Sequence, residues 1–113
     1  MIQLHESQHG DSTLVALSGK LDASTTPTTE ARLLELVREG NKFVAIDFSG
    51  VTYLASSGLR MLLVITRQIT ALEGKLVLCN LDQTMKDTLA VTGFLPYFCL
   101  AGTSDEALKV LAE

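Results

Sequence analysis

The sequence predicts a small α/β domain with a mixed sheet of about five strands and about four helices. Three observations lead to this fold class. Strand-like and helix-like patterns alternate along most of the 113 residues, which favours crossover connections and parallel strands. The chain starts with two short alternating segments that are typical of an antiparallel hairpin. Finally, 47% of the residues are apolar, and a chain of this length is expected to form one domain with one core, residues 1–113.

The N-terminal third of the chain predicts a hairpin followed by a helix. Apolar and polar residues alternate over Ile2–Ser7 and, less strictly, over Thr13–Leu17, with a Gly-Asp turn between them. A helix is then expected over Pro27–Glu39, because its apolar residues fall on one helical face. Thr26 is the expected N-cap of that helix, since proline is well tolerated in a first turn.

The middle of the chain predicts a buried strand and a strongly apolar helix. Phe43–Phe48 is a nearly continuous apolar run rich in β-branched and aromatic residues, which is typical of a strand buried on both faces. A short loop is expected after this strand. Ser56 is the expected N-cap of the helix that follows, over Ser57–Leu72.

The C-terminal third predicts two further strands and two further helices. The strands are Lys75–Cys79 and, more weakly, Pro96–Leu100, and the helix between them is Asp82–Thr92. Thr103, followed three residues later by Glu106, is typical of a capping box at the start of the last helix. The residues of this helix that are expected to face inward are Ala107, Leu108 and Leu111.

Charge and hydropathy argue against several classes of protein. With 9 basic and 13 acidic residues the net charge is −4, so a nucleic-acid binder is disfavoured because no basic excess exists to neutralise phosphates. The longest unbroken apolar runs, Met61–Ile65 among them, are five residues and far too short to span a membrane. No export signal is expected, so the predicted location is the cytoplasm. Cys79 and Cys99 are accordingly expected to be reduced and buried.

Common catalytic and metal-binding motifs are missing from the sequence. It contains no HExxH, no Walker-type phosphate loop and no GxGxxG after a strand. No histidine follows the Ser56-Ser57 pair, so no general base for a serine nucleophile is evident. His5 and His9 lie far from any other cluster of potential ligands. We therefore expect a domain that binds a partner, without a cofactor or a metal, and not an enzyme.

The most informative segment is Asp47–Leu59, in which a buried strand ends and a serine pair opens a helix. As an N-cap, Ser56 would accept a hydrogen bond from a first-turn N–H. Gly58 is a poor helix former and costs about 1 kcal/mol relative to alanine. It either keeps a surface bare so that another chain can approach, or it permits tight packing against the sheet or the preceding loop.

Four sequence motifs along the chain together resemble a known family. In chain order they are Leu17–Asp22, Asp47–Tyr53, Ser56–Leu59 and Thr92–Phe98. Their residues, order and spacing resemble the STAS domain family, in particular the stand-alone bacterial anti-sigma factor antagonists. The resemblance covers nearly the whole chain and implies the single α/β domain expected above.

This resemblance implies a regulatory protein that catalyses nothing itself. Such a protein binds an anti-sigma factor that is also a serine kinase, and binding frees the sigma factor. The kinase phosphorylates the first serine of the Ser-Ser-Gly motif, which is Ser56 here with Ser57 as the alternative, and a phosphoserine phosphatase removes the phosphate. The partner-binding residues that the motif and the neighbouring loop imply are Asp22, Ser24, Ser56, Ser57, Gly58 and Arg60.

A phosphate on Ser56 is physically compatible with a helix start. Phosphoserine adds about −1.5 to −2 charge at neutral pH. The open N–H groups and the helix dipole favour such an anion by about 0.3–1 kcal/mol. Arg60, four residues further along the same helical face, is either a partner for the phosphate or a solvated surface side chain.

Two positions depart from the family pattern. Ala55 stands where the family usually has an acidic residue, and Arg60 stands where it often has a small one. Both changes make the site less negative. The alternatives are a divergent member that binds its partner constitutively, and a STAS subunit of another assembly, such as a lipid-transport ATPase or a stress-signalling scaffold, without a phosphoswitch.

Overall fold

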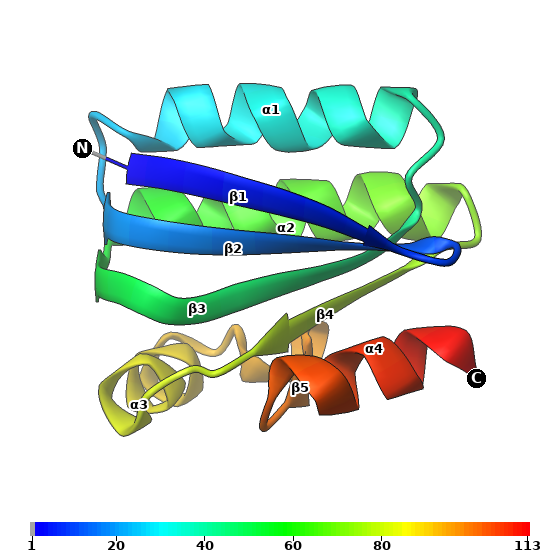
Figure 1. Cartoon of the computed structure of the whole chain (residues 1–113). Coiled ribbons are helices and arrows are strands. Elements are labelled where there is room, and N and C mark those ends of the chain that lie inside the picture. Colours follow the sequence, from blue (N-terminus) through cyan, green and yellow to red (C-terminus); the bar gives the residue numbers. More distant parts are fainter. Residues whose placement is uncertain (1) are drawn as a thin grey trace.

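A five-stranded mixed sheet forms the centre of the molecule in the computed structural model, which describes residues 2–113 (Figure 1). The strands are β1 (Ile2–His9), β2 (Ser12–Leu21), β3 (Phe43–Leu54), β4 (Lys75–Cys79) and β5 (Cys99–Ala101). They lie side by side in sequence order. β1 and β2 form the antiparallel hairpin, and the pairs β2–β3, β3–β4 and β4–β5 are parallel. The predicted α/β class and mixed sheet are confirmed.

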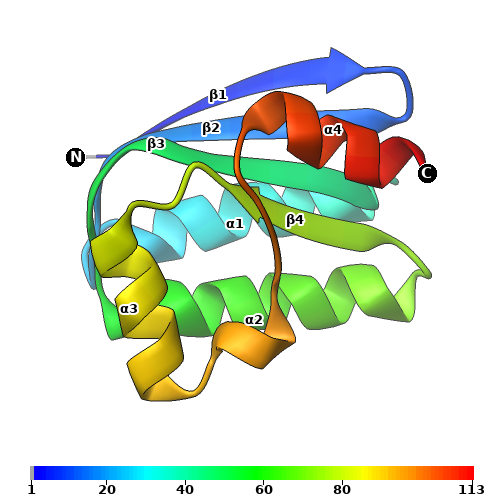
Figure 2. The ribbon, with the colours of Figure 1, turned by 90° about the horizontal axis from the view of Figure 1, so that it is seen from below.

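The four helices cover both faces of this sheet. They are α1 (Thr26–Arg38), α2 (Ser56–Ala71), α3 (Gln83–Thr92) and α4 (Ser104–Ala112). α1 and α2 lie side by side on one face, and α4 packs on the opposite face (Figure 2). Met85 and Leu89 of α3 belong to the same buried cluster as the inward-facing residues of α1 and α2. Within residues 2–113, no helix combines the length and the apolarity needed to cross a membrane.

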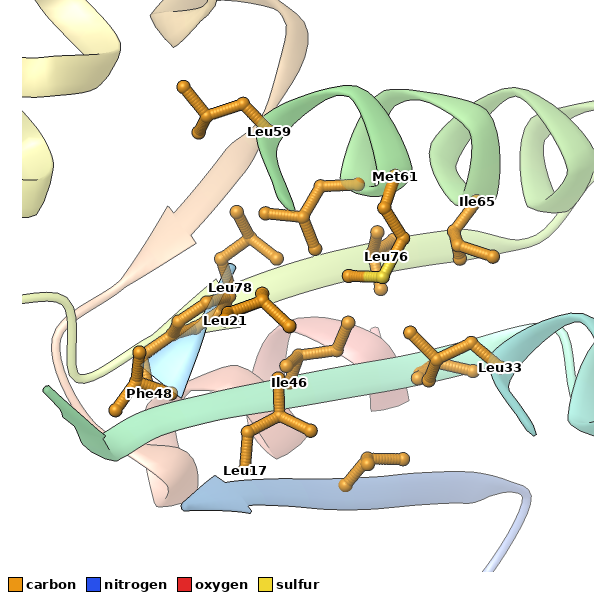
Figure 3. Close-up of a cluster of buried hydrophobic side chains, with 14 of the residues drawn as sticks. Leu17, Leu21, Leu33, Ile46, Phe48, Leu59, Met61, Ile65, Leu76 and Leu78 are labelled. Carbon is orange, nitrogen blue, oxygen red and sulfur yellow. The ribbon is translucent and has the colours of Figure 1, made fainter. Parts of the chain in front are cut away.

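The larger hydrophobic core lies between the sheet and helices α1 and α2. In Figure 3, Met61 and Ile65 of α2 point toward the sheet, where Ile46 and Leu78 lie, and all four side chains are at most 1% exposed. A second cluster under α4 contains Ala45, Val77, Cys79, Ala107 and Leu111. Because β3 and β4 contribute to both clusters, they carry the continuous apolar runs that predicted strands buried on both faces.

β3 is longer than the sequence predicted. It continues to Leu54, so the loop expected after Phe48 is wrong. The β2–β3 register slips twice. The step from Ala16 to Ser18 in β2 is two residues, whereas the paired step from Asp47 to Gly50 in β3 is three, and a second slip follows between Gly19 and Lys20. Each slip inserts one extra residue, as in a β-bulge. Ser49 and Gly50, residue types that are common in turns, are accommodated within β3 at the first of these slips.

Two C-terminal predictions need correction. Pro96 does not begin a strand: Leu95–Tyr97 forms a 3₁₀ turn, and β5 starts at Cys99. The proline has no N–H for a strand ladder but suits the first turn of a helix. Cys99 is half-buried, whereas Cys79 is fully buried as predicted. Leu108 of α4 is half-buried and packs against the second hydrophobic cluster, so its predicted inward orientation is confirmed.

The predicted capping box at α4 is present in modified form. Thr103 is the N-cap, and its hydroxyl accepts a hydrogen bond from the Glu106 N–H at 3.1 Å. The Glu106 carboxylate accepts from the N–H of Gly102, one residue before the N-cap, at 3.0 Å. Both bonds hold the chain at the point where it leaves β5 and turns into α4.

Candidate phosphorylation and docking site

Two connections meet at the carboxyl ends of β2 and β3. These are the β2–α1 loop, residues 22–25, and the single residue Ala55 that joins β3 to α2. Since β2 and β3 are parallel, both connections leave the sheet at the same edge, where functional sites of α/β folds are commonly built. The Ala55 N–H donates to the carbonyl of Leu21 at 2.9 Å and joins the two connections directly.

Ser56 lies at the first position of α2 and is exposed. The prediction that Ser56 is the N-cap is wrong. Ala55 occupies that position with extended backbone dihedrals, and no side chain caps the helix. The reason is that β3 runs directly into α2 with one linking residue, so the helix starts one residue early. In the described part of the chain, the Ser56 hydroxyl takes part in no hydrogen bond, which leaves it accessible beside the open N–H groups of the first turn.

Ser57 has a different environment from its neighbour. It is half-buried, and its hydroxyl oxygen lies 3.3 Å from the hydroxyl oxygen of Thr26 in α1. Thr26 directs its own hydroxyl hydrogen to the carbonyl of Asp22 at 2.6 Å. Because each hydroxyl has one hydrogen, Ser57 is the donor to Thr26. Ser57 therefore joins α2 to the start of α1.

The β2–α1 loop is organised by the carboxylate of Asp22. One of its oxygens accepts from the Ser24 hydroxyl at 2.7 Å, the Ser24 N–H at 2.9 Å and the Thr25 N–H at 3.1 Å. The hydrogen bond from the Ser24 hydroxyl and then that from the Thr25 backbone lower the pKa of Asp22. Asp22 thus holds the loop that presents the exposed Ser24.

The expected N-cap of α1 is also displaced by one residue. Thr25, not Thr26, is the N-cap, and Pro27 occupies the second helical position. The Thr25 hydroxyl does not cap the helix: its oxygen accepts from the Asp22 N–H at 3.0 Å, and its hydrogen is donated to the carbonyl of Lys20 at 2.8 Å. Thr26 is buried as the first helical residue, which is why its hydroxyl can reach Ser57.

Gly58 is buried under the first turn of α2. A Cβ atom at this position would lie 2.8 Å from the Cδ1 of Leu54 and 3.0 Å from the Cδ2 of Leu21. The sequence left two interpretations of Gly58, a surface kept bare for another chain or tight packing within the domain. These contacts favour tight packing against the ends of β2 and β3. Gly58 allows the first turn of α2 to pack closely on the ends of β2 and β3. This close packing determines how far Ser56 lies from the ends of the two strands.

Arg60 is exposed one turn after Ser56, and within residues 2–113 it forms no salt bridge. Its guanidinium therefore has no competing carboxylate partner in the described chain.

One exposed aromatic residue near the site, Tyr53, was not among the predicted site residues. Tyr53 of β3 is 52% exposed and pairs in register with Lys20 of β2. It lines a shallow depression between the end of β3 and the start of α3, together with Asp82 and Thr84. The sequence placed Tyr53 in a loop, so nothing pointed to a side chain fixed by a strand.

The described residues offer no evident metal centre. Among residues 2–113, no three His, Cys, Asp or Glu side chains come together closely enough to hold an ion. The fold and the site together define a small mixed α/β domain that presents a serine hydroxyl at the start of a helix. The profile of the STAS domain matches residues 3–107, and the chain belongs to the STAS domain family.

Relatives and solved structures agree with this assignment. The chain is 32% identical over 98 residues, 86% of its length, to "Putative anti-sigma factor antagonist BtrV" of Bordetella bronchiseptica, and the match covers 84% of that protein. An anti-sigma factor antagonist from Mycobacterium paratuberculosis has the same fold, with a TM-score of 0.91 and 25% identity over all of this chain and 96% of the other. The Bacillus cell fate determinant SpoIIAA in its phosphorylated form is 23% identical, with a TM-score of 0.74, over 97% of this chain and 98% of that one.

Proposed function

We propose that this protein is an anti-sigma factor antagonist whose docking is switched off by phosphorylation at Ser56. It binds an anti-sigma factor that is also a serine kinase, and so releases a sigma factor in the cytoplasm. A phosphoserine phosphatase restores the binding form, and the domain itself carries out no catalysis. The observation that carries the proposal is the exposed Ser56 hydroxyl at the start of α2, without an intrachain hydrogen bond in the described residues, in a chain of the STAS family.

Ser56 is the better acceptor of the two serines. A kinase needs a hydroxyl that can enter its active site, and Ser56 is exposed whereas Ser57 is half-buried. Phosphorylation of Ser57 would also break its hydrogen bond to Thr26 and place a dianion between α1 and α2. Phosphorylation of Ser57 would therefore destabilise the folded domain, whereas phosphorylation of Ser56 would change only the surface that meets the partner.

The energetics favour a switch that leaves the domain folded. The phosphate would lie beside unpaired N–H groups at a helix start, a position that favours an anion by about 0.3–1 kcal/mol. Arg60 is one turn away on the same face and can form a charge-assisted bond to it. In the complex, by contrast, a small hydroxyl is replaced by a bulky dianion, and each 1.4 kcal/mol lost weakens binding about tenfold.

The first experiment maps the modification. The protein is incubated with the anti-sigma factor kinase of its own genome and ATP, and the phosphate is located by mass spectrometry. Modification is expected on Ser56 in the parent and in Ser57→Ala, and none in Ser56→Ala. Phosphate on Ser57 in the parent, or none on either serine with an active kinase, would overturn the assignment of Ser56.

The second experiment tests whether charge at Ser56 controls binding. Calorimetry compares the parent with Ser56→Asp and with a matched control, Ser104→Asp, which places the same charge at the first position of α4 on the other sheet face. Ser56→Asp is expected to weaken binding to the anti-sigma factor at least about tenfold, and Ser104→Asp is expected to leave it unchanged. Equal affinities for all three proteins would show that charge at Ser56 is not the control.

A second candidate function rests on Ala55, which brings no negative charge next to the serine pair. If this change prevents recognition by the kinase, the domain would bind its partner constitutively or act as a STAS subunit of another assembly. The mapping experiment separates the two functions, because only the first requires phosphate on Ser56.

A further inference from the structure

The outer face of α2 carries an unusual charge for this molecule. α2 contains two arginines, Arg60 and Arg67, and no acidic residue, so its net charge is +2. The whole chain has a net charge of −4, so the remainder carries −4 − 2 = −6. α1 has two arginines and two glutamates, α3 has one lysine and one aspartate, and α4 has one lysine and two acids. Among the four helices of the described chain, only α2 is positive.

The two arginines lie on one stripe that begins at Ser56. At 100° per residue, Ser56, Arg60, Val64 and Arg67 fall within about 80° of each other around the helix axis. All four residues are exposed, and Val64 is 37% exposed. The buried side of α2, with Met61 and Ile65, faces the sheet in Figure 3, so this stripe faces away from it. We call these four residues the α2 stripe.

Neither arginine is neutralised by the fold. The salt bridges among residues 2–113 involve Arg32 with Glu6 and Glu35, on the other side of α1, and none involves Arg60 or Arg67. The two charges of the stripe are about 10 Å apart, since the arginines are seven positions apart along the helix. An apolar valine lies between them.

We propose that the α2 stripe docks on an acidic protein surface, and that this surface belongs to the anti-sigma factor. The inference rests on the proposed function and deepens it by assigning the partner's charge. The matching surface would present carboxylates about 10 Å apart on either side of an apolar contact for Val64.

The remainder of the chain favours a local acidic patch over an extended polyanion. A charge of −6 outside α2 repels a nucleic acid or an anionic membrane as it comes close to the body of the domain. A compact acidic patch meets mainly the stripe, because salt screens more distant charges over about 10 Å at 0.1 M.

The same arrangement explains how one phosphate can cancel docking. Phosphoserine adds about −1.5 to −2 charge, which reduces the +2 of α2 to between about +0.5 and 0. The phosphate lies at the end of the stripe, one turn from Arg60, so it both neutralises the face and engages a cation that the partner needs. Phosphorylation therefore removes an attraction as well as adding bulk.

The test reverses the stripe and compares it with a matched reversal elsewhere. Arg60→Glu with Arg67→Glu changes the net charge of the chain from −4 to −8. The control, Arg38→Glu with Lys109→Glu, reaches the same −8 through exposed residues at the ends of α1 and α4. A third variant, Arg60→Lys with Arg67→Lys, keeps the charge. Thermal unfolding is measured first, so that binding is compared only between folded proteins.

Stopped-flow association with the anti-sigma factor kinase is then measured at about 0.1 M and about 1 M NaCl. For the parent, the lysine variant and the control, the association rate is expected to fall as salt rises. For the stripe reversal, the rate at low salt is expected to be at least about tenfold lower, and to rise with salt because repulsion is screened. Phosphatidylserine vesicles and duplex DNA serve as alternative polyanions and are expected to bind none of the proteins.

Each contrary result has a defined meaning. If the parent binds and phosphate on Ser56 releases it, but the stripe reversal associates no more slowly than the control, the inference fails while the proposed function stands. If vesicles or DNA bind the parent and lose binding in the stripe reversal, the stripe serves another polyanion and the inference is wrong. If the parent does not bind the kinase at all, both the proposed function and the inference fail.

Discussion

Replacing Gly50 with alanine should destabilise the fold although Gly50 is exposed. Gly50 follows the first bulge of β3 and pairs with Ser18 of β2. A Cβ atom there would lie 2.8 Å from the carbonyl oxygen of Leu17 and 3.2 Å from the Cα and Cβ of Ser18. The nearest atoms belong to the backbone of β2, which cannot move without opening the sheet.

The size of the effect follows from two opposing contributions. Overpacking against atoms that cannot move costs about 1–3 kcal/mol. Alanine lowers the entropy of the unfolded chain and so returns about 0.4–1 kcal/mol. The net expectation is a loss of about 1–2 kcal/mol. With an unfolding entropy of about 0.24 kcal/mol/K for 113 residues, the melting temperature should fall by about 4–8 °C.

Thermal unfolding followed by circular dichroism tests this prediction. Ser49→Ala, at the neighbouring exposed position, adds no atoms and serves as the matched control. Its melting temperature should stay within about 2 °C of the parent's, since surface substitutions usually change stability by no more than 0.5 kcal/mol. A Gly50→Ala protein that melts with the control would refute the argument that this approach of the two backbones requires glycine.

Three further predictions concern local interactions. Asp82→Ala removes the side-chain cap that accepts from the Met85 N–H at 2.8 Å and should cost about 1 kcal/mol in chemical denaturation; an unchanged midpoint would contradict it. The pKa of Asp22 lies below its ordinary value of 3.8, so its stabilising contribution is present above that value and is lost as pH falls through the folded pKa. The stability difference between the parent and Asp22→Asn should therefore shrink below about pH 4, and a constant difference would oppose this reasoning. Burial, and then the charge of Asp47, raise the pKa of Cys79 to about 11. At neutral pH iodoacetamide should therefore modify the half-buried Cys99 well before Cys79, and equal rates in the folded protein would refute this.

Suitable controls accompany these measurements. Asp105→Ala removes a first-turn carboxylate of α4 that does not cap the helix, so it separates the cap bond from the helix-dipole effect. In urea, Cys79 and Cys99 should react at similar rates, because both lose the protection of the fold.

The order of elements could be predicted from the sequence because it depends on local pattern. The apolar run Phe43–Phe48 predicted the first half of β3, and the strongly apolar segment Ser57–Leu72 predicted α2 to within one residue at each end. The parallel sheet followed from the alternation of strands and helices, since a parallel pair needs a crossover connection. The family motif around Ser56 also pointed to the edge where β3 meets α2.

The details of the site depended on residues distant in the chain. Ser57 is bound to Thr26, 31 residues earlier, and this contact distinguishes it from Ser56 although the two serines are neighbours. Gly58 packs on Leu21 and Leu54, and only their positions show that the glycine is needed for close packing.

The sequence by itself determined the class of fold, the location of the serine pair at a helix start and the presence of basic but no acidic residues in α2. Each of these follows from residues that are close together in the chain. Only the tertiary structure decided which serine is accessible, where β3 ends and which residues cap the helices. Those outcomes depend on the slips in the β2–β3 register and on contacts between α1 and α2. Such contacts form only when the sheet brings segments from different parts of the chain to one edge, which no local pattern specifies.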